Sequence, residues 1–454
     1  MHDLRKKIFE SGKTVSRKAR SRQQSAQASP ASSRAGSRAA SQHASEEEDF
    51  SDYDYEESLT SSIVNSEDGE ELEPTALSET LHNRIVDLLD QKRDSGQDRE
   101  NKLIAYTELI RHHSSADEAE EIDGQLNDII PMLLKTIQGR RTPQGVIWAL
   151  KALTITVLST GNESIHDRVY PTLRSLCQDT DYGDEDESTK IEIIRAMCMS
   201  TMCGGGSAEA AEEFLEFLLE IIESDGHTVQ AGDNGPIVAA ALEAWGFAAS
   251  GLEDLEEQSA RALEAFIEQL ESSDVGVQVA AGSNIALLLE MAREYTKETG
   301  ETWNMRYNQD DLLGRVNALT KESSKSISKR DRKQLHYTFN SIMTSLERGT
   351  GPGYSTARRL DNYEEEYGYR QKYRIQNISV VIDSWSLSAQ LGMLKSILGG
   401  GLASHYLNNP LVKQMLNGAK TEYLSSPPKD DMEKRQSKAR KAGHGRKLMK
   451  EVSD

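Results

Sequence analysis

A recurring apolar pattern constrains the fold of this chain more than any other feature of its sequence. Five nine-residue strings place hydrophobic residues at similar offsets, at intervals of about 40 to 50 residues, which is the spacing of helical-repeat proteins. Two strings, Ile129–Ile137 and Val169–Cys177, also share a proline at their third position. The others are Arg84–Lys92, Phe214–Ile222 and Leu263–Glu271. Such a chain is expected to stack repeated units and to serve as a scaffold.

Each string is followed by a second apolar segment in which small residues alternate with Ile, Leu and Val. Examples are Ile237–Ala249 and Val277–Ala292. A helix, a short turn and a second helix form the HEAT or armadillo unit. A further pair is expected over 310–348. The sequence therefore predicts an all-α fold, an armadillo- or HEAT-like α-solenoid over residues 74–349.

The segments on either side of the solenoid differ from it in composition. Residues 1–73 are rich in Ser, Ala, Gln and charge, and they cannot bury enough apolar surface to offset the entropy of ordering. We expect a disordered tail there. Tyr373–Asp383 predicts a short extended stretch, and short helices should follow from Ser384 to about Leu416. We interpret residues 350–420 as a small C-terminal helical cap and residues 421–454 as a basic arm.

Charge is distributed in blocks. The chain carries 53 Lys and Arg against 74 Asp and Glu, and this net charge of -21 argues against general affinity for nucleic acid. Residues 1–45 hold ten basic and two acidic side chains, whereas residues 46–73 hold thirteen acidic ones and no Lys or Arg. Such blocks are typical of interaction tails.

Membrane insertion, secretion and disulfide bonding are not expected. We find no apolar run of transmembrane length and no hydrophobic region of a secretory signal at the N-terminus. Cys177, Cys198 and Cys203 are few and odd in number, which favours reduced, buried thiols in a cytoplasmic protein.

The motifs that could suggest catalysis have simpler structural explanations. Gly204–Ser207 and Gly399–Gly401 lack the Lys-Ser/Thr of a phosphate-binding loop and suit helix ends. Ser384 lacks the flanking glycines of a nucleophile elbow and suits an N-cap. Cys198 and Cys203 have no zinc-ligand spacing. We therefore predict no catalytic residue, metal site, cofactor or small-molecule substrate.

Two basic segments are the candidate binding sites. A cationic arm of this kind neutralises RNA phosphates, although a solvated tail or a nuclear localisation signal is an alternative. Its residues are Lys434, Arg435, Lys438, Arg440, Lys441, Arg446, Lys447 and Lys450. The second segment, at the last repeat, contains Lys329, Arg330, Arg332 and Lys333. It fits RNA contact and an exposed helix face paired with nearby acids equally well.

A set of short motifs occurs in a specific order between residues 77 and 419. The motifs are Ser272–Val275, Val279–Gly282, Ala286–Arg293, Lys329–Gln334, Ile382–Trp385, Leu398–Gly401 and His405–Asn409. In these motifs and their order the chain resembles the interferon-related developmental regulator family.

The resemblance implies an armadillo-like protein without enzymatic activity. Members of this family are described as factors on translationally inactive ribosomes, where a C-terminal helical segment enters the path of mRNA and tRNA. They are also described as nuclear co-regulators that meet histone-deacetylase complexes. We expect a cytoplasmic adaptor that binds the ribosome and rRNA and represses translation through its basic C-terminal segment. The alternative is a nuclear scaffold whose concave solenoid surface binds chromatin factors or other protein co-regulators.

Overall fold

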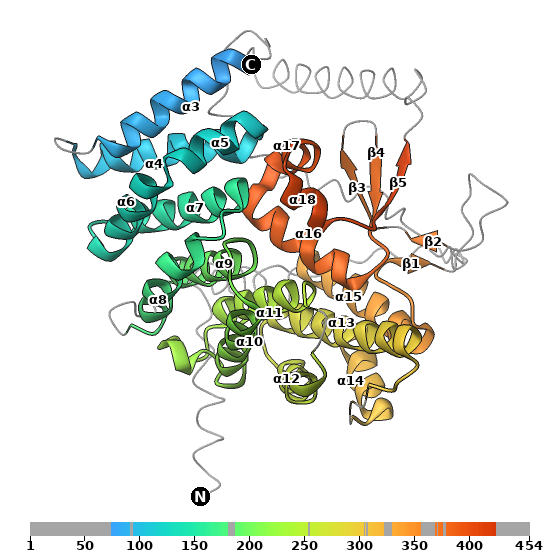
Figure 1. The fold of residues 1–454 in the computed structure, drawn as a ribbon. Coiled ribbons are helices and arrows are strands. Elements are labelled where there is room, and N and C mark those ends of the chain that lie inside the picture. The colour runs from blue at the N-terminus through green and yellow to red at the C-terminus, as the bar shows by residue number, and fades with distance from the viewer. Residues whose placement is uncertain are drawn as a thin grey trace, which may run out of the picture. The chain divides into compact units, whose positions relative to one another are not determined.

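The structure is a computed structural model in which the chain is mostly helical (Figure 1). It describes residues 74–90, 94–179, 187–252, 255–303, 305, 307–321, 329–355, 368–369, 371–375 and 378–423. The tail over residues 1–73 and the arm beyond residue 423 lie outside this range, so their expected disorder and contacts stay predictions.

Fourteen helical elements precede the first strand of the described chain. They are α3 (Pro74–Leu89), α4 (Gly96–His112), α5 (Ala116–Gly124), α6 (Leu126–Gly139), α7 (Pro143–Thr160), α8 (Ile165–Cys177), α9 (Glu187–Cys203), α10 (Ala208–Glu223), η3 (His227–Val229), α11 (Gly235–Ala249), α12 (Glu256–Gln269), α13 (Val275–Thr299), α14 (Gln309–Lys321) and α15 (Lys329–Arg348). The repeated strings fall on α3, α6, α8, α10 and α12. The second apolar segments fall on α7, α9, α11 and α13.

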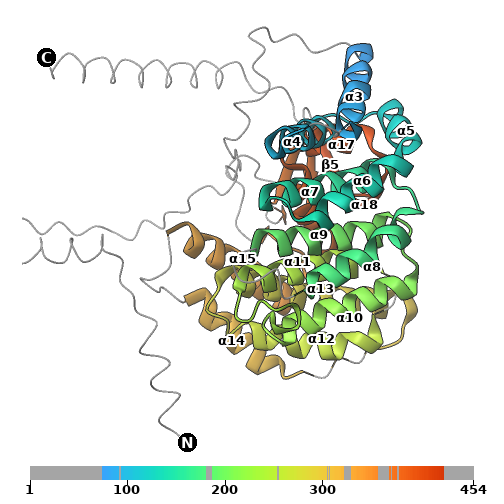
Figure 2. The same ribbon diagram turned by 90° about the vertical axis from the view of Figure 1, so that its left-hand side faces the viewer.

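The helices form two rows. In the inner row, α4, α7, α9, α11, α13 and α15 each contact the next helix of the row. The outer helices α3, α6, α8, α10, α12 and α14 each contact the inner helix that completes their pair. Figure 2 shows α4, α7, α9 and α11 following one another down the view. This succession of pairs matches the repeat spacing in the sequence, except that the short helix α5 was not predicted.

The ends of α7 are set by the residues that cap them. The Thr142 hydroxyl accepts a hydrogen bond from the backbone N–H of Gly145, and Pro143 occupies the first turn of α7. Gly161 ends α7 with a positive φ of 59°, a conformation that glycine adopts without strain. Local sequence therefore sets where this helix starts and stops.

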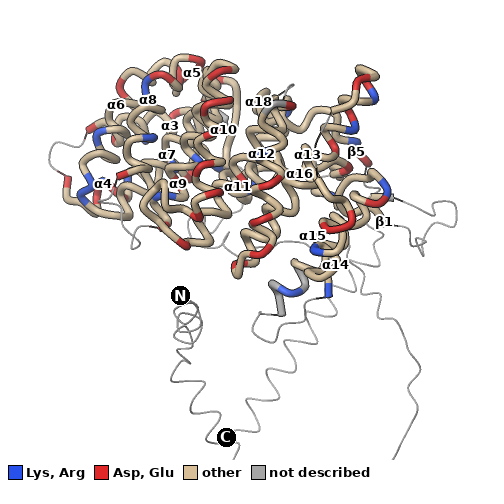
Figure 3. Tube along the Cα trace, turned by 90° about the horizontal axis from the view of Figure 1, so that it is seen from below, with Lys and Arg blue, Asp and Glu red and all other residues tan. Residues whose placement is uncertain are grey.

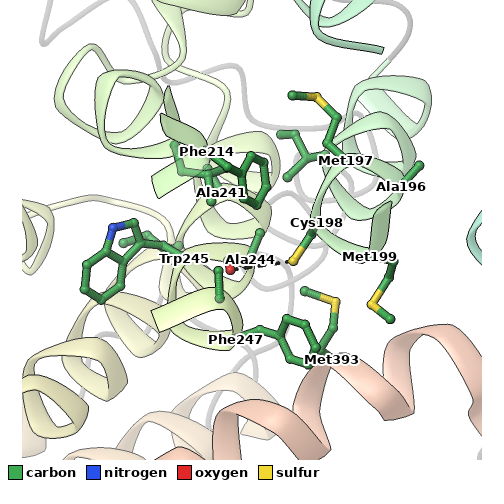
Figure 4. Packing of buried hydrophobic residues seen from close by; sticks show 14 of the residues in the cluster. Ala196, Met197, Cys198, Met199, Phe214, Ala241, Ala244, Trp245, Phe247 and Met393 are labelled. Atoms are coloured by element: carbon green, nitrogen blue, oxygen red, sulfur yellow. Dashed lines mark hydrogen bonds between the residues drawn. The ribbon is translucent and has the colours of Figure 1, made fainter. Parts of the chain in front are cut away.

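Small residues let the inner helices approach closely. A Cβ on Gly246 of α11 would lie 2.3 Å from the amide oxygen of Asn284 on α13, so a larger residue there would have to displace the Asn284 side chain. Figure 4 shows Cys198 of α9 pointing toward Ala244 of α11, beside Trp245 and Phe247. Trp245 is only 1 % exposed and packs edge to face on Phe266 of α12, with ring centroids 4.8 Å apart. The core is therefore continuous between neighbouring pairs.

The last described part of the chain mixes strands with short helices. Its elements are β1 (Tyr354–Ser355), β2 (Gly368–Tyr369), β3 (Lys372–Ile375), β4 (Ile378–Val381), α16 (Trp385–Leu398), η4 (Gly399–Gly401), α17 (Leu402–Asn408), α18 (Pro410–Met415) and β5 (Lys420–Tyr423). β1 pairs with β2, and β3, β4 and β5 form an antiparallel sheet in that order. The predicted extended stretch and short helices are confirmed, and β5 was not predicted.

The predicted C-terminal cap lies along the inner row and not at one end of it. Helix α16 contacts α4, α7, α11 and α13, while α17 contacts α4 and α18 contacts α7 (Figure 1). The physical reason is that α16 buries six apolar side chains, which need a long apolar surface to cover them. They are Trp385, Leu387, Leu391, Met393, Leu394 and Leu398.

Among the described residues, α13 is the one helix long and apolar enough to cross a membrane. No apolar run of this length was expected from the sequence. Most of the apolar window of α13 is buried against α11, α12, α15 and α16. The core helix of a folded domain has these same properties.

Candidate functional site

The two basic segments fall at or beyond the limits of the described chain. The eight cations of the C-terminal arm lie outside the described residues. Lys329, Arg330, Arg332 and Lys333 occupy the first turns of α15, where only the side chain of Arg332 is described, and it is half-buried. A shared RNA-binding surface of these residues therefore stays a prediction.

The surface of the outer helices α10 and α12 is acidic. Helix α10 carries six glutamates and no basic residue. On α12, Arg261 binds two of those glutamates, Glu223 at 2.6 Å and Glu216. Figure 3, with Asp and Glu in red, shows acidic positions along α10 and α12. This part of the molecule would repel an RNA backbone.

A buried carboxylate joins the C-terminal helices to the inner row. Glu290 of α13 is 7 % exposed, and its Oε1 accepts hydrogen bonds from the backbone N–H groups of Trp385, at 2.7 Å, and Ser386, at 3.2 Å. These groups begin α16 and have no partner within the helix. The indole N–H of Trp385 also donates to the Ser345 hydroxyl of α15 at 2.9 Å. Glu290 thus fixes where α16 starts on the array.

Burial controls the protonation of this carboxylate. It raises the pKa of Glu290 to about 7, although the N–H groups of Ser386 and Trp385 act in the opposite direction. Nearby Glu294 raises the pKa further and Arg293 lowers it. The joint therefore changes charge near neutral pH.

A second joint explains two of the three consecutive glycines, Gly399 and Gly401. Arg111 at the end of α4 donates from Nε to the carbonyl of Leu398 at 3.1 Å. A Cβ on Gly401 would lie 1.7 Å from the carbonyl oxygen of Arg111, and Gly399 has a positive φ of 50°. Only glycine lets this backbone lie against α4. The predicted role of the glycines in ending α16 is confirmed, and their contact with α4 is an additional constraint.

A third joint is formed by two buried polar residues, His405 of α17 and Asn409, which lies between α17 and α18. His405 is fully buried and its Nε2 lies 2.9 Å from the carbonyl oxygen of Ile110, so Nε2 carries the proton and donates it. Its Nδ1 then accepts from the amide of Asn409, 3.3 Å away, and that amide also donates to the carbonyl of Leu158 at 2.8 Å. Burial lowers the pKa of His405, which keeps the ring neutral.

A pocket of about 110 Å³ remains open on the inner row, which we call the inner-face pocket. It lies where α4, α7, α9 and α16 meet, and Trp148 and Lys151 of α7 form one wall. The Lys151 ammonium lies 4.9 Å from the centre of the Trp148 ring. The other lining residues are Thr107, Glu108, Arg111, Thr154, Ile155, Glu192, Arg195, Ser396 and Ile397.

Two of the three cations that line this pocket have a carboxylate partner. Arg111 binds Glu108 at 3.3 Å, and Arg195 binds Glu192 at 2.9 Å. Within the described ranges, no carboxylate lies within ion-pair distance of Lys151. One cation of the pocket therefore remains available to an anionic group.

The cysteines and Ser384 have structural surroundings in the described chain. All three cysteines are free and buried, as predicted, and burial raises the pKa of Cys177 and of Cys203 to about 12. Ser384 caps α16 by accepting from the N–H of Leu387 at 3.1 Å. No group of His, Cys, Asp and Glu suited to a metal ion occurs in the part of the chain that the structure describes.

Several important residues were not singled out from the sequence. Glu290 is a charged residue inside an otherwise apolar segment of α13, and that contrast was a usable signal. Arg111 and Lys151 carry no such signal, because only packing brings α4, α7 and α16 together. Four of the motifs noted above, those containing Glu290, Trp385, Gly399 and His405, meet at the three joints.

Comparison with known proteins identifies the family. The family model described as interferon-related developmental regulator matches residues 36–347. The chain belongs to this family. The matched range starts within the N-terminal tail and ends in α15, so α16–α18 lie beyond it, whereas the residues that hold them, such as Glu290 and Arg111, lie within it.

Individual relatives extend over a similar length of chain. An uncharacterised protein of Schizosaccharomyces pombe is 27 % identical over 354 residues, which cover 74 % of each chain. Interferon-related developmental regulator 2 of Mus musculus is 24 % identical, covering 76 % of this chain and 75 % of its own. Interferon-related developmental regulator 1 of Sus scrofa is 23 % identical, covering 77 % and 74 %. The names of the mouse and pig proteins indicate a regulatory role for those two proteins.

Proposed function

We propose that this protein is a cytoplasmic, non-enzymatic adaptor that binds the ribosome and represses translation. In this proposal the basic arm over residues 434–450 contacts rRNA and occupies the path of mRNA and tRNA. Family membership supports a regulatory role. The charge separation carries the finer proposal, because the acidic outer helices disfavour RNA and the eight cations of the arm favour it.

We propose further that α3–α15 form an armadillo- or HEAT-like solenoid. The support is the regular succession of helix pairs, each contacting the next through the inner row. In such an array each unit is stabilised mainly by its neighbours. The array would then serve as a rigid support for the arm.

The test is sedimentation of a variant in which Lys434, Arg435, Lys438, Arg440 and Lys441 are all replaced by Ala. We expect it to leave the ribosomal fractions of a lysate while the thermal unfolding midpoint stays unchanged. A matched control replaces five exposed lysines and arginines elsewhere in the chain. If the arm variant sediments with ribosomes as the parent does, at both low and high salt, the proposal fails.

The alternative, a nuclear scaffold for co-regulators or chromatin factors, gives a different outcome. The arm variant would then lose nuclear import but keep its protein partners in extract. The inner face that such partners were expected to bind is partly covered by α16–α18. No described contact favours this alternative over the ribosome.

A further inference from the structure

We propose that the inner-face pocket binds the chain's own acidic segment, Asp54–Glu73, through the ammonium group of Lys151 and the face of Trp148. This segment immediately precedes α3. The inference concerns an intramolecular interaction and does not depend on ribosome binding.

The pocket has the chemistry of a site for one carboxylate at a time. Lys151 is its cation without a carboxylate partner among the described residues, whereas Arg111 and Arg195 are already bound to Glu108 and Glu192. Lys151 is half-buried, so an ion pair formed there is less screened than one at an exposed lysine. The half-buried indole of Trp148 provides an apolar wall beside it.

The position of the acidic segment in the chain favours this occupant. The segment ends at Glu73, where α3 begins, and α3 contacts α4. Helix α4 supplies Thr107, Glu108 and Arg111 to the pocket. Twenty residues can extend over about 70 Å, whereas α4 spans about 26 Å, so the segment can reach any side of α4.

The composition of the acidic segment also matches the chemistry of the inner-face pocket. Between Asp54 and Glu73 there are eight acidic residues and no Lys or Arg, and Tyr55, Leu59 and Ile63 are interspersed with them. Acidic groups can approach Lys151 while an aromatic or aliphatic neighbour packs on Trp148. An RNA strand is disfavoured at the same place, because Glu108 and Glu192 would lie beside several successive phosphates.

The test uses the full chain and a carbodiimide, which joins a lysine amine to a carboxylate only when the two are in contact. We expect mass spectrometry to find Lys151 linked to acidic residues between Asp54 and Glu73, with at least a several-fold loss of these links in high salt. Lys135 is the control, because it is exposed on α6 outside the pocket. The variant Lys151→Arg should lose these links while keeping the charge.

A second measurement, the acetylation rate of Lys151, does not depend on forming a carbodiimide cross-link. Replacing the eight acidic residues by Asn or Gln should raise the acetylation rate of Lys151 several-fold and leave that of Lys135 unchanged. The proposal is overturned if Lys151 forms no link to the segment, or if Lys135 forms as many. It also fails if mixed isotope-labelled chains show links only between copies, or if single-stranded RNA but not the segment protects Lys151.

Discussion

Individual buried polar residues decide how the C-terminal helices are held. Glu290, His405 and Asn409 are each almost fully buried, and each bonds to backbone groups of another element. A buried polar group without a partner costs roughly 1 to 3 kcal/mol, so these residues favour one docking arrangement over others.

The charge state of Glu290 predicts a pH-dependent stability. Its pKa is about 7 in the folded protein and 4.5 is the ordinary value, so between these pH values the folded chain binds more protons than the unfolded chain. The free energy of unfolding should therefore fall as pH rises from 4.5 to 7, by at most roughly 1.4 kcal/mol per pH unit from this group. Urea unfolding of the parent and of Glu290→Gln between pH 5 and 8 measures how the free energy of unfolding changes with pH.

The substitution keeps an oxygen acceptor for the two N–H groups but removes the titration. Glu290→Gln should flatten this slope, whereas Glu264→Gln on the exposed side of α12 should not. His405 acts in the opposite sense, because its lowered pKa costs stability as pH falls below 6.5. An unchanged slope in Glu290→Gln would show that Glu290 does not titrate in this range.

Trp245 and Trp148 should differ in how much their replacement by Ala lowers the free energy of unfolding. Trp245→Ala should lower the free energy of unfolding by about 3 to 5 kcal/mol, because the indole is fully enclosed between α11 and α12. Trp148→Ala should cost less than half as much, since its ring is half-buried beside the inner-face pocket. Denaturant titration of both variants provides the comparison, and equal losses would place both rings in the core.

At the scale of elements, α16–α18 pack against the helices of the inner row. The apolar side of α16 is buried against the inner row, and the three joints set its position. Apolar burial is not directional, whereas hydrogen bonds to backbone carbonyls are. The joints therefore determine which inner helices α16 covers.

This division of roles predicts a local effect of Asn409→Ala. The substitution removes the cap of α18 and leaves the Leu158 carbonyl without its bond, so amide exchange should accelerate in residues 402–416. The loss in local stability should be about 1 to 3 kcal/mol. Asn408→Ala, at the exposed neighbouring position, is the control. Equal acceleration in both variants would contradict the role given to Asn409.

At the scale of the whole molecule, acidic and basic residues lie in separate parts of the chain. An acidic helical body and a basic arm on one chain should limit RNA contact to the arm. Salt then reports the number of phosphates bound, because binding releases counterions.

Ribosome affinity should therefore depend steeply on salt. Each arm cation that contacts a phosphate should contribute roughly 0.7 to 0.9 to the slope of log affinity against log salt, if polyelectrolyte behaviour transfers to rRNA. Sedimentation over a salt series, with single Lys or Arg to Ala variants of the arm, measures this. A slope that stays the same in every variant would place the RNA contact elsewhere.

The sequence by itself determined the helical class, the helix pairs, their caps and the family, because apolar periodicity and capping residues act over a few turns. The extended stretch near Val380 and the short helices after Ser384 also followed from local residue preferences. Only the tertiary structure decided that α16–α18 lie along the inner row, that β5 joins the sheet, and that Lys151 has no carboxylate partner among the described residues. These features join residues as many as 295 positions apart, as His405 and Ile110 are, and no local pattern encodes such contacts.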